Sequence, residues 1–526
     1  MRTYPLYLDG QDVETGKWIH TVAASAFLRD SRAAFDLKRA LDLDRGAVPT
    51  SDVAGRVAIG DDSHNLRAIA AARAAARGYR ELPLETRRQI LLDFHYALLE
   101  RVEEVIQILV AEGHPRRLAQ WELSGVLRAT DPDTIDWYVS QLHQEFFSAG
   151  RLLELVRRPD GVVCVNPPQN AAGSNSVMGM FALLAGNTLV VKAPRSSPLS
   201  VLYLYRDVAA PILDKHGAPP GTLNIICGSS PRIVRTWLDS PDVDDILFFG
   251  DSTAGLKLGR EAVARGKKPI LELAGNDGFV VWHDADLEAA ARALTEAYYG
   301  SGQICMVPKY AVVHPSIVDD FLRLFVPRVK ALRPGYPEDP DTVLSPVLKA
   351  DRYFDFLAEA TEAGCPVLCG GRRLDVEGNP AIDGAFLEPT VVRVDGLTDA
   401  RRLSCVREET FFPLLPVVVP APAENAVLLE RIVGLLNANP YGLRNSVWTC
   451  SDEVAGTMAA AVVNGGLLKI NDSHIGFTSY LATHGGTGLT GGPFGELNYA
   501  GLRTTHLQGI CWGDGDPRPL EPEVLR

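Results

Sequence analysis

Two residues of this chain could together form a thioester and then hydrolyse it. Glu272 lies in the apolar, strand-like sequence LELAG, and Cys305 ends the sequence GQIC 33 positions later. A cysteine thiolate can form a covalent intermediate, and a carboxylate can activate the water that resolves it. Each residue alone also fits a simpler role, Glu272 as an acid at a strand end and Cys305 as a small core residue. The rest of the chain must decide between these interpretations.

Size and charge limit the classes of function. The 526 residues, 46% hydrophobic and 22% charged, predict two or three globular domains. A formal net charge of −13 argues against nucleic acid and against an anionic membrane surface, because both require clustered Lys and Arg. No apolar run is long enough to cross a bilayer, and the N-terminus lacks the hydrophobic segment of a signal peptide.

Cysteine usage indicates the compartment and argues against a metal. The eight cysteines are scattered without a CxxC pair, which favours a reducing compartment, and we expect a cytoplasmic protein. Cys365 and Cys369 are four positions apart, but no second pair of ligands lies near them. HExxH and EF-hand motifs are also absent from the sequence, so we predict no metal site.

The chain alternates between helical and strand-like segments. Helices are expected at residues 66–80 and from Leu84 to about 112. Short apolar runs at 161–165, 187–192, 223–227 and 245–249 each end at Gly, Pro or a polar turn. Apolar strands separated by helix-length segments predict a parallel sheet covered on both faces, with ligands at the carboxyl ends of its strands. A second α/β segment follows from about residue 276 to 469.

Two further patterns carry less weight. Residues 486–491 fit GxGxxG literally, but a phosphate-binding loop needs a strand before it and a helix after it, so a Gly-rich surface loop is the better interpretation. No Ser-His-Asp or Cys-His arrangement stands out in the sequence. The last fifty-odd residues are irregular and are interpreted as an extension or an oligomer contact.

Seven segments in a fixed order resemble one known family. They are Pro168-Gln169-Asn170 (Pro-Trp-Asn in the family), 185–192 AGNTLVVK (AGNTVVLK), 248–252 FFGDS (FTGST), 271–275 LELAG (LELGG), 302–305 GQIC (GQxC), 408–413 EETFFP (EEIFGP) and 439–443 NPYGL (YGL). On these segments the chain resembles the aldehyde dehydrogenase superfamily, as a divergent member, from about residue 65 to about 505. The resemblance implies an α/β fold with two Rossmann-like parallel-sheet domains and a small β oligomerisation extension.

The resemblance also implies domains and partners. Residues 1–130 and 155–275 would form the dinucleotide-binding domain, and residues 276–474 the catalytic domain. Residues 131–154 and 475–526 would bridge subunits of a homodimer or homotetramer. The first fifty residues and the tail after 502 match no family segment.

Roles for individual residues follow from the same resemblance. Cys305 would attack an aldehyde, and Asn170 with the Cys305 backbone N–H would bind the oxyanion. Glu272 would then activate water to release the acid. Gly300 and Gly302 would let the backbone approach the substrate and the nicotinamide. The implied cofactor-binding residues are Lys192, Arg195, Pro168, Gln169, Gly228, Gly250, Asp251, Ser252, Gly255, Leu273, Glu409 and Phe411, with Lys192 at the adenosine ribose, Glu409 at the nicotinamide ribose and Phe411 near the nicotinamide ring.

Several positions depart from the family pattern. Arg195 stands where the family often has Glu, and an Arg would attract a 2′-phosphate, so we predict that NADP is used at least as well as NAD. Asp251 replaces Ser near the expected pyrophosphate, where a carboxylate repels phosphate unless it caps the helix. Gln169 replaces Trp, and Asn276 replaces Lys.

Three functions remain open from the sequence. The first is NAD(P)-dependent oxidation of an aldehyde to a carboxylic acid. The second is a CoA-acylating aldehyde dehydrogenase or acyl reductase on the same fold, and the third is a catalytically retired binding protein. The presence of Glu272 favours the first, because CoA-acylating relatives commonly lack this base. Few charges lie near the flanking residues Tyr298, Tyr299, Met306 and Val307, which favours an apolar or aromatic aldehyde.

Overall fold

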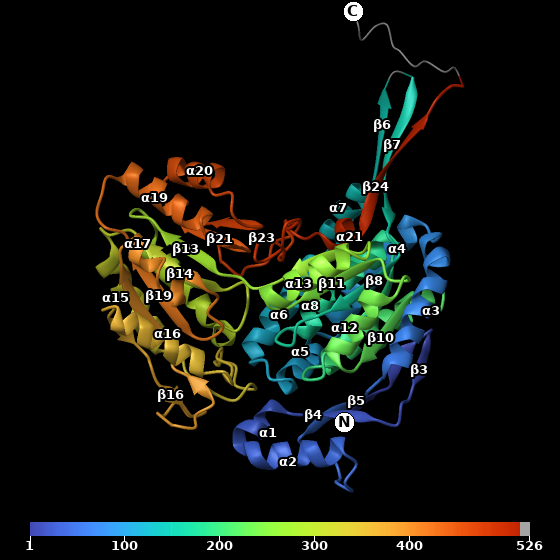
Figure 1. Cartoon of the computed structure of the whole chain (residues 1–526), viewed down its shortest axis with the longest axis horizontal. Helices are drawn as coiled ribbons and strands as arrows, with labels where there is room; N and C mark the ends of the chain where they lie inside the picture. Colours follow the sequence, from blue (N-terminus) through green and yellow to red (C-terminus); the bar gives the residue numbers. More distant parts are fainter. Residues whose placement is uncertain (149, 516–526) are drawn as a thin grey trace, which may run out of the picture.

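The computed structural model describes residues 1–148 and 150–515 of the chain. Two α/β lobes lie side by side, and a narrow β arm rises from one of them (Figure 1). The predicted α/β fold with two parallel sheets and a β extension is confirmed. In the described part of the chain, no helix is both long and apolar enough to cross a membrane.

The first lobe is built on a seven-stranded sheet in the order β12-β11-β8-β9-β10-β2-β3. Its strands β12 (Lys268–Glu272), β11 (Asp245–Phe249), β8 (Val162–Asn166), β9 (Thr188–Ala193) and β10 (Leu223–Cys227) are parallel, and β2 (Leu6–Leu8) and β3 (Gln11–Val13) continue the sheet antiparallel. Every residue of β8, β9 and β10 is buried, as their largely apolar sequences predict for a sheet covered on both faces.

Helices cover this sheet and complete the lobe. The expected helix at 66–80 is α3 (Asp62–Arg80), whereas the single helix allowed from Leu84 to about 112 is two helices, α4 (Leu84–Glu100) and α5 (Val102–Ala111). The chain breaks at Arg101, whose φ of −116° and ψ of 18° are not helical. The other helices of the lobe are α6 (Arg116–Ala129), α7 (Pro132–Leu142), α8 (Ala172–Ser176), α9 (Met178–Ala185), α10 (Leu199–Leu202), η1 (Tyr203–Ala209), α11 (Ala210–Lys215), α12 (Ser230–Asp239), α13 (Ser252–Val263) and α21 (Ala500–Arg503).

The first fifty residues, unassigned from the sequence, are ordered against this lobe. Strands β1 (Arg2–Tyr4), β5 (Val53–Ala58) and β4 (Trp18–Val22) form a small sheet in that order. Helices α1 (Ala24–Arg29) and α2 (Ser31–Asp42) pack beside it around a small apolar cluster that includes Val22 and Leu41.

The second lobe contains another seven-stranded sheet, in the order β15-β18-β19-β14-β13-β21-β22. These strands are β15 (Val367–Cys369), β18 (Thr390–Asp395), β19 (Leu414–Val419), β14 (Pro308–Val313), β13 (Asp277–Val281), β21 (Arg444–Trp448) and β22 (Leu467–Ile470), all parallel except β15. The remaining elements are α14 (Leu287–Leu294), η2 (Thr295–Gly302), α15 (Val318–Lys330), α16 (Asp351–Glu362), β16 (Arg373–Leu374), β17 (Phe386–Leu387), α17 (Leu397–Ala400), α18 (Ser404–Arg407), α19 (Asn425–Asn437), β20 (Tyr441–Gly442), α20 (Asp452–Ala461) and β23 (Thr487–Gly488).

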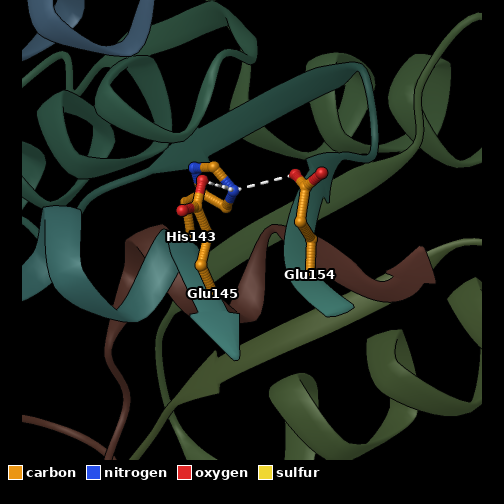
Figure 2. A group of neighbouring side chains, drawn as sticks. All are labelled: His143, Glu145 and Glu154. Carbon is orange, nitrogen blue, oxygen red and sulfur yellow. Dashed lines mark hydrogen bonds and ion pairs between the residues drawn. The ribbon is translucent and has the colours of Figure 1, made fainter. Parts of the chain in front are cut away.

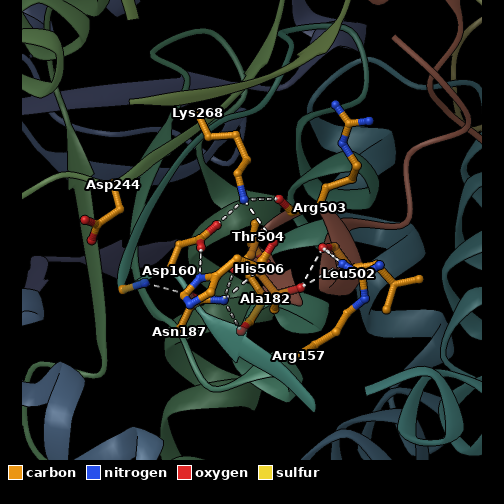
Figure 3. Close-up of polar contacts among 12 residues, drawn as sticks. Arg157, Asp160, Ala182, Asn187, Asp244, Lys268, Leu502, Arg503, Thr504 and His506 are labelled. Atoms are coloured by element: carbon orange, nitrogen blue, oxygen red, sulfur yellow. Dashed lines mark hydrogen bonds and ion pairs between the residues drawn. The ribbon is translucent and has the colours of Figure 1, made fainter. Parts of the chain in front are cut away.

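The arm is an antiparallel sheet of β6 (His143–Ser148), β7 (Arg151–Pro159) and β24 (Thr505–Trp512), with β7 in the middle. At its base, Lys268 of β12 donates to the Asp160 carboxylate and to the backbone carbonyls of Arg503 and Thr505 (Figure 3). Asn187 donates to the carbonyl of Thr504 at 3.0 Å. These bonds anchor β24 to the first lobe.

One titratable cluster lies on the arm itself. The Nε2 atom of His143 is 3.0 Å from a carboxylate oxygen of Glu154 and 3.6 Å from one of Glu145 (Figure 2). The ligand atoms of the three residues lie within 4.8 Å of one another. His143 and Glu145 are exposed and Glu154 is partly buried, and the contact between His143 and Glu154 joins β6 to β7.

Candidate active site

A cavity of about 820 Å³ collects residues from both lobes. Its lining includes Asn166 at the end of β8, Lys192 near the end of β9, Phe249 at the end of β11 and Glu272 at the end of β12. Cys305, from the loop before β14 of the second lobe, lines the same cavity. The cavity therefore lies at the carboxyl ends of the first sheet's strands, where the sequence predicted a ligand.

Cys305 follows a loop whose backbone is held in a rare conformation. Gly300, Ser301 and Gly302 all have positive φ, of 59°, 57° and 71°. At Ser301 this costs about 1–3 kcal/mol, which the surrounding structure must offset. The Ser301 hydroxyl donates to the carbonyl of Ser345 at 2.6 Å, and the Ser345 N–H donates back to it at 3.0 Å. The loop is thus fixed immediately before Cys305.

The environment of Cys305 favours the thiol in this state. Burial, together with the nearby carboxyl groups of Glu409 and Asp277, raises the pKa of Cys305 to about 12. The cations Lys309 and Arg444 act in the opposite direction. Lys309, which the sequence analysis did not single out, is buried and donates to the carbonyls of Gly302 at 2.7 Å and Thr410 at 2.8 Å.

Gly275 brings the Glu272 strand into contact with the cysteine loop. A Cβ atom at Gly275 would lie 2.3 Å from the carbonyl oxygen of Cys305. Only a residue without a side chain permits this approach of the two backbones. The same glycine donates its N–H to a carboxylate oxygen of Glu409 at 3.0 Å.

The carboxyl group of Glu272 is buried and held by the C-terminal segment. Its two oxygens accept hydrogen bonds of 2.7 Å each, from the Gly485 N–H and from the side-chain amide of Asn498. Burial raises the pKa of Glu272 to about 8, and these two bonds offset part of the rise. Glu272 is therefore mostly protonated at neutral pH and ionises just above it.

The Gly-rich segment differs from its predicted role as a surface loop. Thr490 is fully buried, its hydroxyl donates to the carbonyl of Ala274 at 2.7 Å, and its carbonyl accepts the Leu273 N–H at 3.0 Å. The close packing explains the glycines: a Cβ at Gly485 would lie 2.2 Å from the carbonyl oxygen of Glu496. Residues 483–498, assigned from sequence to a bridging segment, thus contact the end of β12, and residues 516–526 of that segment lie outside the described residues.

Asn170 reaches the cysteine loop from the first lobe. Its side-chain nitrogen donates to the carbonyl of Gln303 at 2.9 Å, two residues before Cys305, and Asn170 itself lines the cavity. One N–H of the amide remains for another acceptor, since the side-chain amide carries two. The cavity thus joins a thiol, a carboxyl group and an amide donor.

The model of the aldehyde dehydrogenase family matches residues 46–505 of the chain. This chain belongs to the aldehyde dehydrogenase family. It is 28% identical over 463 residues to the 3,6-anhydro-alpha-L-galactose dehydrogenase of Vibrio sp. (strain EJY3), covering 85% of this chain and 87% of that protein. It is 30% identical over 399 residues to a benzaldehyde dehydrogenase of Bacillus subtilis (strain 168), covering 74% and 77%.

A solved structure with the same fold was determined with a bound cofactor. The glyceraldehyde-3-phosphate dehydrogenase GapN of Methanocaldococcus jannaschii, solved with NADP, superimposes with a TM-score of 0.75 at 25% identity, covering 88% of this chain and 97% of that one. The family resemblance drawn from the sequence is therefore confirmed, and the protein is an enzyme of the NAD(P)-dependent aldehyde dehydrogenase kind.

The cofactor side of this aldehyde dehydrogenase contains most, but not all, of the residues expected there. Those that line the cavity are Pro168, Gln169, Lys192, Gly250, Asp251, Leu273, Glu409 and Phe411. The sequence did not decide the direction of the Asp251 side chain. In the structure its carboxylate caps α13 by accepting the Ala254 N–H at 2.9 Å. Burial lowers the pKa of Lys192 to about 8.

Four expected cofactor residues lie outside this lining. They are Arg195, which is exposed, and Gly228, Ser252 and Gly255. The two glycines serve packing, because a Cβ at Gly228 would lie 3.0 Å from the Gly60 carbonyl oxygen and one at Gly255 would lie 2.1 Å from the Leu273 side chain. The sequence could not separate these packing glycines from glycines that face a ligand.

A slot between α12 and α13 was missed from the sequence. It is lined by the apolar residues Val234, Leu238, Ala254 and Leu258 and by the charged residues Arg235, Lys257 and Glu261. The Ser252 hydroxyl is buried without a partner at the start of α13. An apolar slot beside two helix N-termini fits a dinucleotide, with its base in the slot and its phosphates at the helix ends.

The substrate side also differs from expectation. Of the flanking residues named from sequence, Met306 lines the cavity, whereas Tyr298, Tyr299 and Val307 do not. Tyr298 is fully buried and donates its hydroxyl to the carbonyl of Thr390 at 3.0 Å. The lining comes instead from α6, α8, α9 and the loop at Phe477, including Trp121, Glu122, Ser174, Asn175, Met178 and Phe181.

The enzyme also contains a buried Ser-His-Asp arrangement that was not evident in the sequence. The Ser446 hydroxyl lies 2.6 Å from His474 Nδ1, and His474 Nε2 lies 3.3 Å from an Asp277 carboxylate oxygen. All three residues are buried and none lines the cavity. The cluster links β13 and β21 and has no access to substrate.

Proposed function

We propose that the enzyme oxidises an aldehyde to a carboxylic acid with NAD(P) through a covalent adduct on Cys305. The observation that carries this proposal is the single cavity that contains Cys305, Glu272 and Asn170 and continues into the slot between α12 and α13.

The first half of the reaction forms a thioester. The Cys305 sulfur, after losing its proton, attacks the aldehyde carbon and gives a tetrahedral thiohemiacetal. The free N–H of the Asn170 amide and the backbone N–H of Cys305 bind the developing oxyanion, and one such donor contributes roughly 3–4 kcal/mol. NAD(P) bound in the cavity would supply the hydride acceptor, so that loss of hydride from the former aldehyde carbon would leave a thioester on Cys305.

The second half releases the acid. Ionised Glu272 takes a proton from a water molecule, and the hydroxide oxygen attacks the thioester carbon. The carbon–sulfur bond breaks, the Cys305 sulfur leaves as thiolate, and the carboxylic acid departs. Because burial raises the pKa of Glu272 to about 8, this step accelerates as the pH rises toward 8.

We further propose that NADP serves at least as well as NAD. Arg195 and Lys257 are exposed, and neither forms a hydrogen bond or ion pair with another described residue. Lys257 lines the slot between α12 and α13. Cations without acidic partners can bind a 2′-phosphate. Arg195 does not line the cavity. The proposal therefore depends on the positive charge of Arg195 and not on its position in the cavity lining.

The arm supports a homodimer or homotetramer. It projects from the body of the first lobe (Figure 1), and it exposes apolar side chains, among them Phe147 at 78% and Trp512 at 57% of their surface. Such exposed apolar side chains mark interaction sites. Cysteines with no disulfide among the described residues support a cytoplasmic location.

The test follows absorbance of the reduced nicotinamide with NAD or NADP and a panel of aldehydes. We expect activity that Cys305→Ala abolishes. Glu272→Gln should retain one burst of reduced nicotinamide per site and lose about 10²–10⁴-fold in turnover. Turnover that requires added coenzyme A would instead favour the acyl-transfer alternative. No activity with or without coenzyme A would favour a retired binding protein.

A further inference from the structure

The substrate side of the cavity combines aromatic and polar groups. Trp121 and Phe477 lie with ring centroids 5.0 Å apart and planes 30° from parallel. Gly125 makes room for this arrangement, because a Cβ there would lie 2.4 Å from the Phe477 ring. Both rings pack in the apolar cluster that includes Ile304 and contacts Cys305. Two aromatic side chains thus pack against the same apolar cluster as Cys305.

A buried carboxylate lies next to these rings, contrary to the few charges expected there. Glu122 follows Trp121 on α6 and is only 4% exposed. One of its oxygens is 2.6 Å from His114 Nδ1, and the other accepts a hydrogen bond from the Ser174 hydroxyl at 3.0 Å. Burial alone would lower the pKa of His114, but Glu122 and, more weakly, Glu112 raise it above its ordinary value. A carboxylate oxygen can accept more than one hydrogen bond, and therefore Glu122 can still receive one from a hydroxyl group.

Two further polar side chains line the cavity with hydrogen-bonding atoms that no described residue occupies, the amide of Asn175 and the Nε2 atom of His484. The side-chain amide of Asn175 forms no hydrogen bond with any described residue. His484 is 9% exposed; its Nδ1 lies 2.7 Å from the Thr483 hydroxyl, and its Nε2 has no partner among the described residues and is not enclosed by protein. Burial lowers the pKa of His484 to about 3, so its ring is neutral and can donate or accept according to its tautomer.

We propose that the substrate is a hydroxylated aldehyde, whose hydroxyl groups bond to Asn175, His484 or the Glu122–Ser174 pair while its C–H face packs on Trp121 and Phe477. An aldehyde without hydroxyl groups would displace water from these polar groups and leave them unpaired, which is costly in a closed site. This inference rests on the proposed aldehyde oxidation.

The experiment compares kcat/KM for two pairs of similar size, glyceraldehyde against propanal and 4-hydroxybenzaldehyde against 4-methylbenzaldehyde. The first pair tests an aliphatic hydroxyl and the second a phenolic one. We expect at least one hydroxylated member to exceed its partner by about tenfold or more, since a site built to bond a hydroxyl strongly rejects the analogue that lacks it. Asn175→Leu should reduce that ratio several-fold, and the apolar control Met178→Leu on the same wall should leave the ratio unchanged.

The possible results test the hydroxylated substrate and the proposed aldehyde oxidation separately. Oxidation of propanal and 4-methylbenzaldehyde as fast as their partners would overturn the hydroxylated substrate and leave aldehyde oxidation intact. Absence of oxidation for all four aldehydes with both cofactors would count against the two proposals together. An Asn175→Leu variant that lowers kcat/KM equally for both members of a pair would show that Asn175 does not bind the substrate hydroxyl.

Discussion

Asn498 should control the pH at which the enzyme releases acid. Its side-chain amide donates to one Glu272 oxygen at 2.7 Å, and this bond counteracts the effect of burial on the Glu272 pKa. Asn498→Ala removes this donor and leaves the Gly485 N–H bond in place. We therefore expect the pKa of Glu272 to rise above its present value of about 8.

The size of this rise follows from the strength of one hydrogen bond. Bonds to charged groups contribute about 1.5–3 kcal/mol, and one pKa unit corresponds to about 1.36 kcal/mol. The pKa should therefore rise by about one to two units. At pH 7 the ionised fraction of Glu272 is roughly one in ten with a pKa of about 8, and the variant should release acid about 10- to 100-fold more slowly.

The assay separates thioester formation from hydrolysis. Stopped-flow absorbance gives the burst of reduced nicotinamide, and quenched samples give the acid released, from pH 6 to pH 10. The burst should remain in Asn498→Ala, and the acid-release profile should move to higher pH. In Glu272→Gln, the rate of acid release should no longer follow the ionisation of residue 272.

Thr490→Val is the matched control. It removes a buried hydrogen bond to the Ala274 carbonyl without touching the Glu272 carboxylate, so it should leave the midpoint of the profile in place. A profile for Asn498→Ala that superimposes on the wild-type profile would refute the argument that this amide sets the pKa of the base.

Three further predictions concern the nucleophile loop, stability and cofactor choice. Gly275→Ala would place Cβ 2.3 Å from the Cys305 carbonyl oxygen, and the resulting displacement of the loop should reduce kcat/KM by about 10²-fold. The control Gly456→Ala, whose Cβ would meet nothing within 4 Å, should leave kcat/KM unchanged. Glu272 binds its proton more tightly in the folded state than in the unfolded chain, so wild-type stability should fall as pH rises from about 4.5 to about 8, by at most about 5 kcal/mol; thermal unfolding of Glu272→Gln should lack this decline. Arg195→Glu should lower the ratio of NADP to NAD efficiency by about tenfold or more; an unchanged ratio in steady-state kinetics would exclude a role for Arg195.

The sequence alone determined the sheets and the order of the chemical groups. Largely apolar runs such as Thr188–Ala193 encode buried parallel strands, because a strand covered on both faces needs apolar side chains on each. The ordered family segments also marked Cys305 and Glu272 as the candidate nucleophile and base. These patterns can be recognised in the sequence because they depend on residues that are close together in the chain.

Only the tertiary structure decided what surrounds these groups. The Gly485 and Asn498 bonds to Glu272 join residues more than 200 positions apart, and nothing in a Gly-rich segment indicates which strand end it contacts. Asn175 and His484 face the cavity because of how their helix and loop pack. The direction of a side chain and the closeness of two backbones depend on the packing of distant segments, which no local pattern of residues encodes.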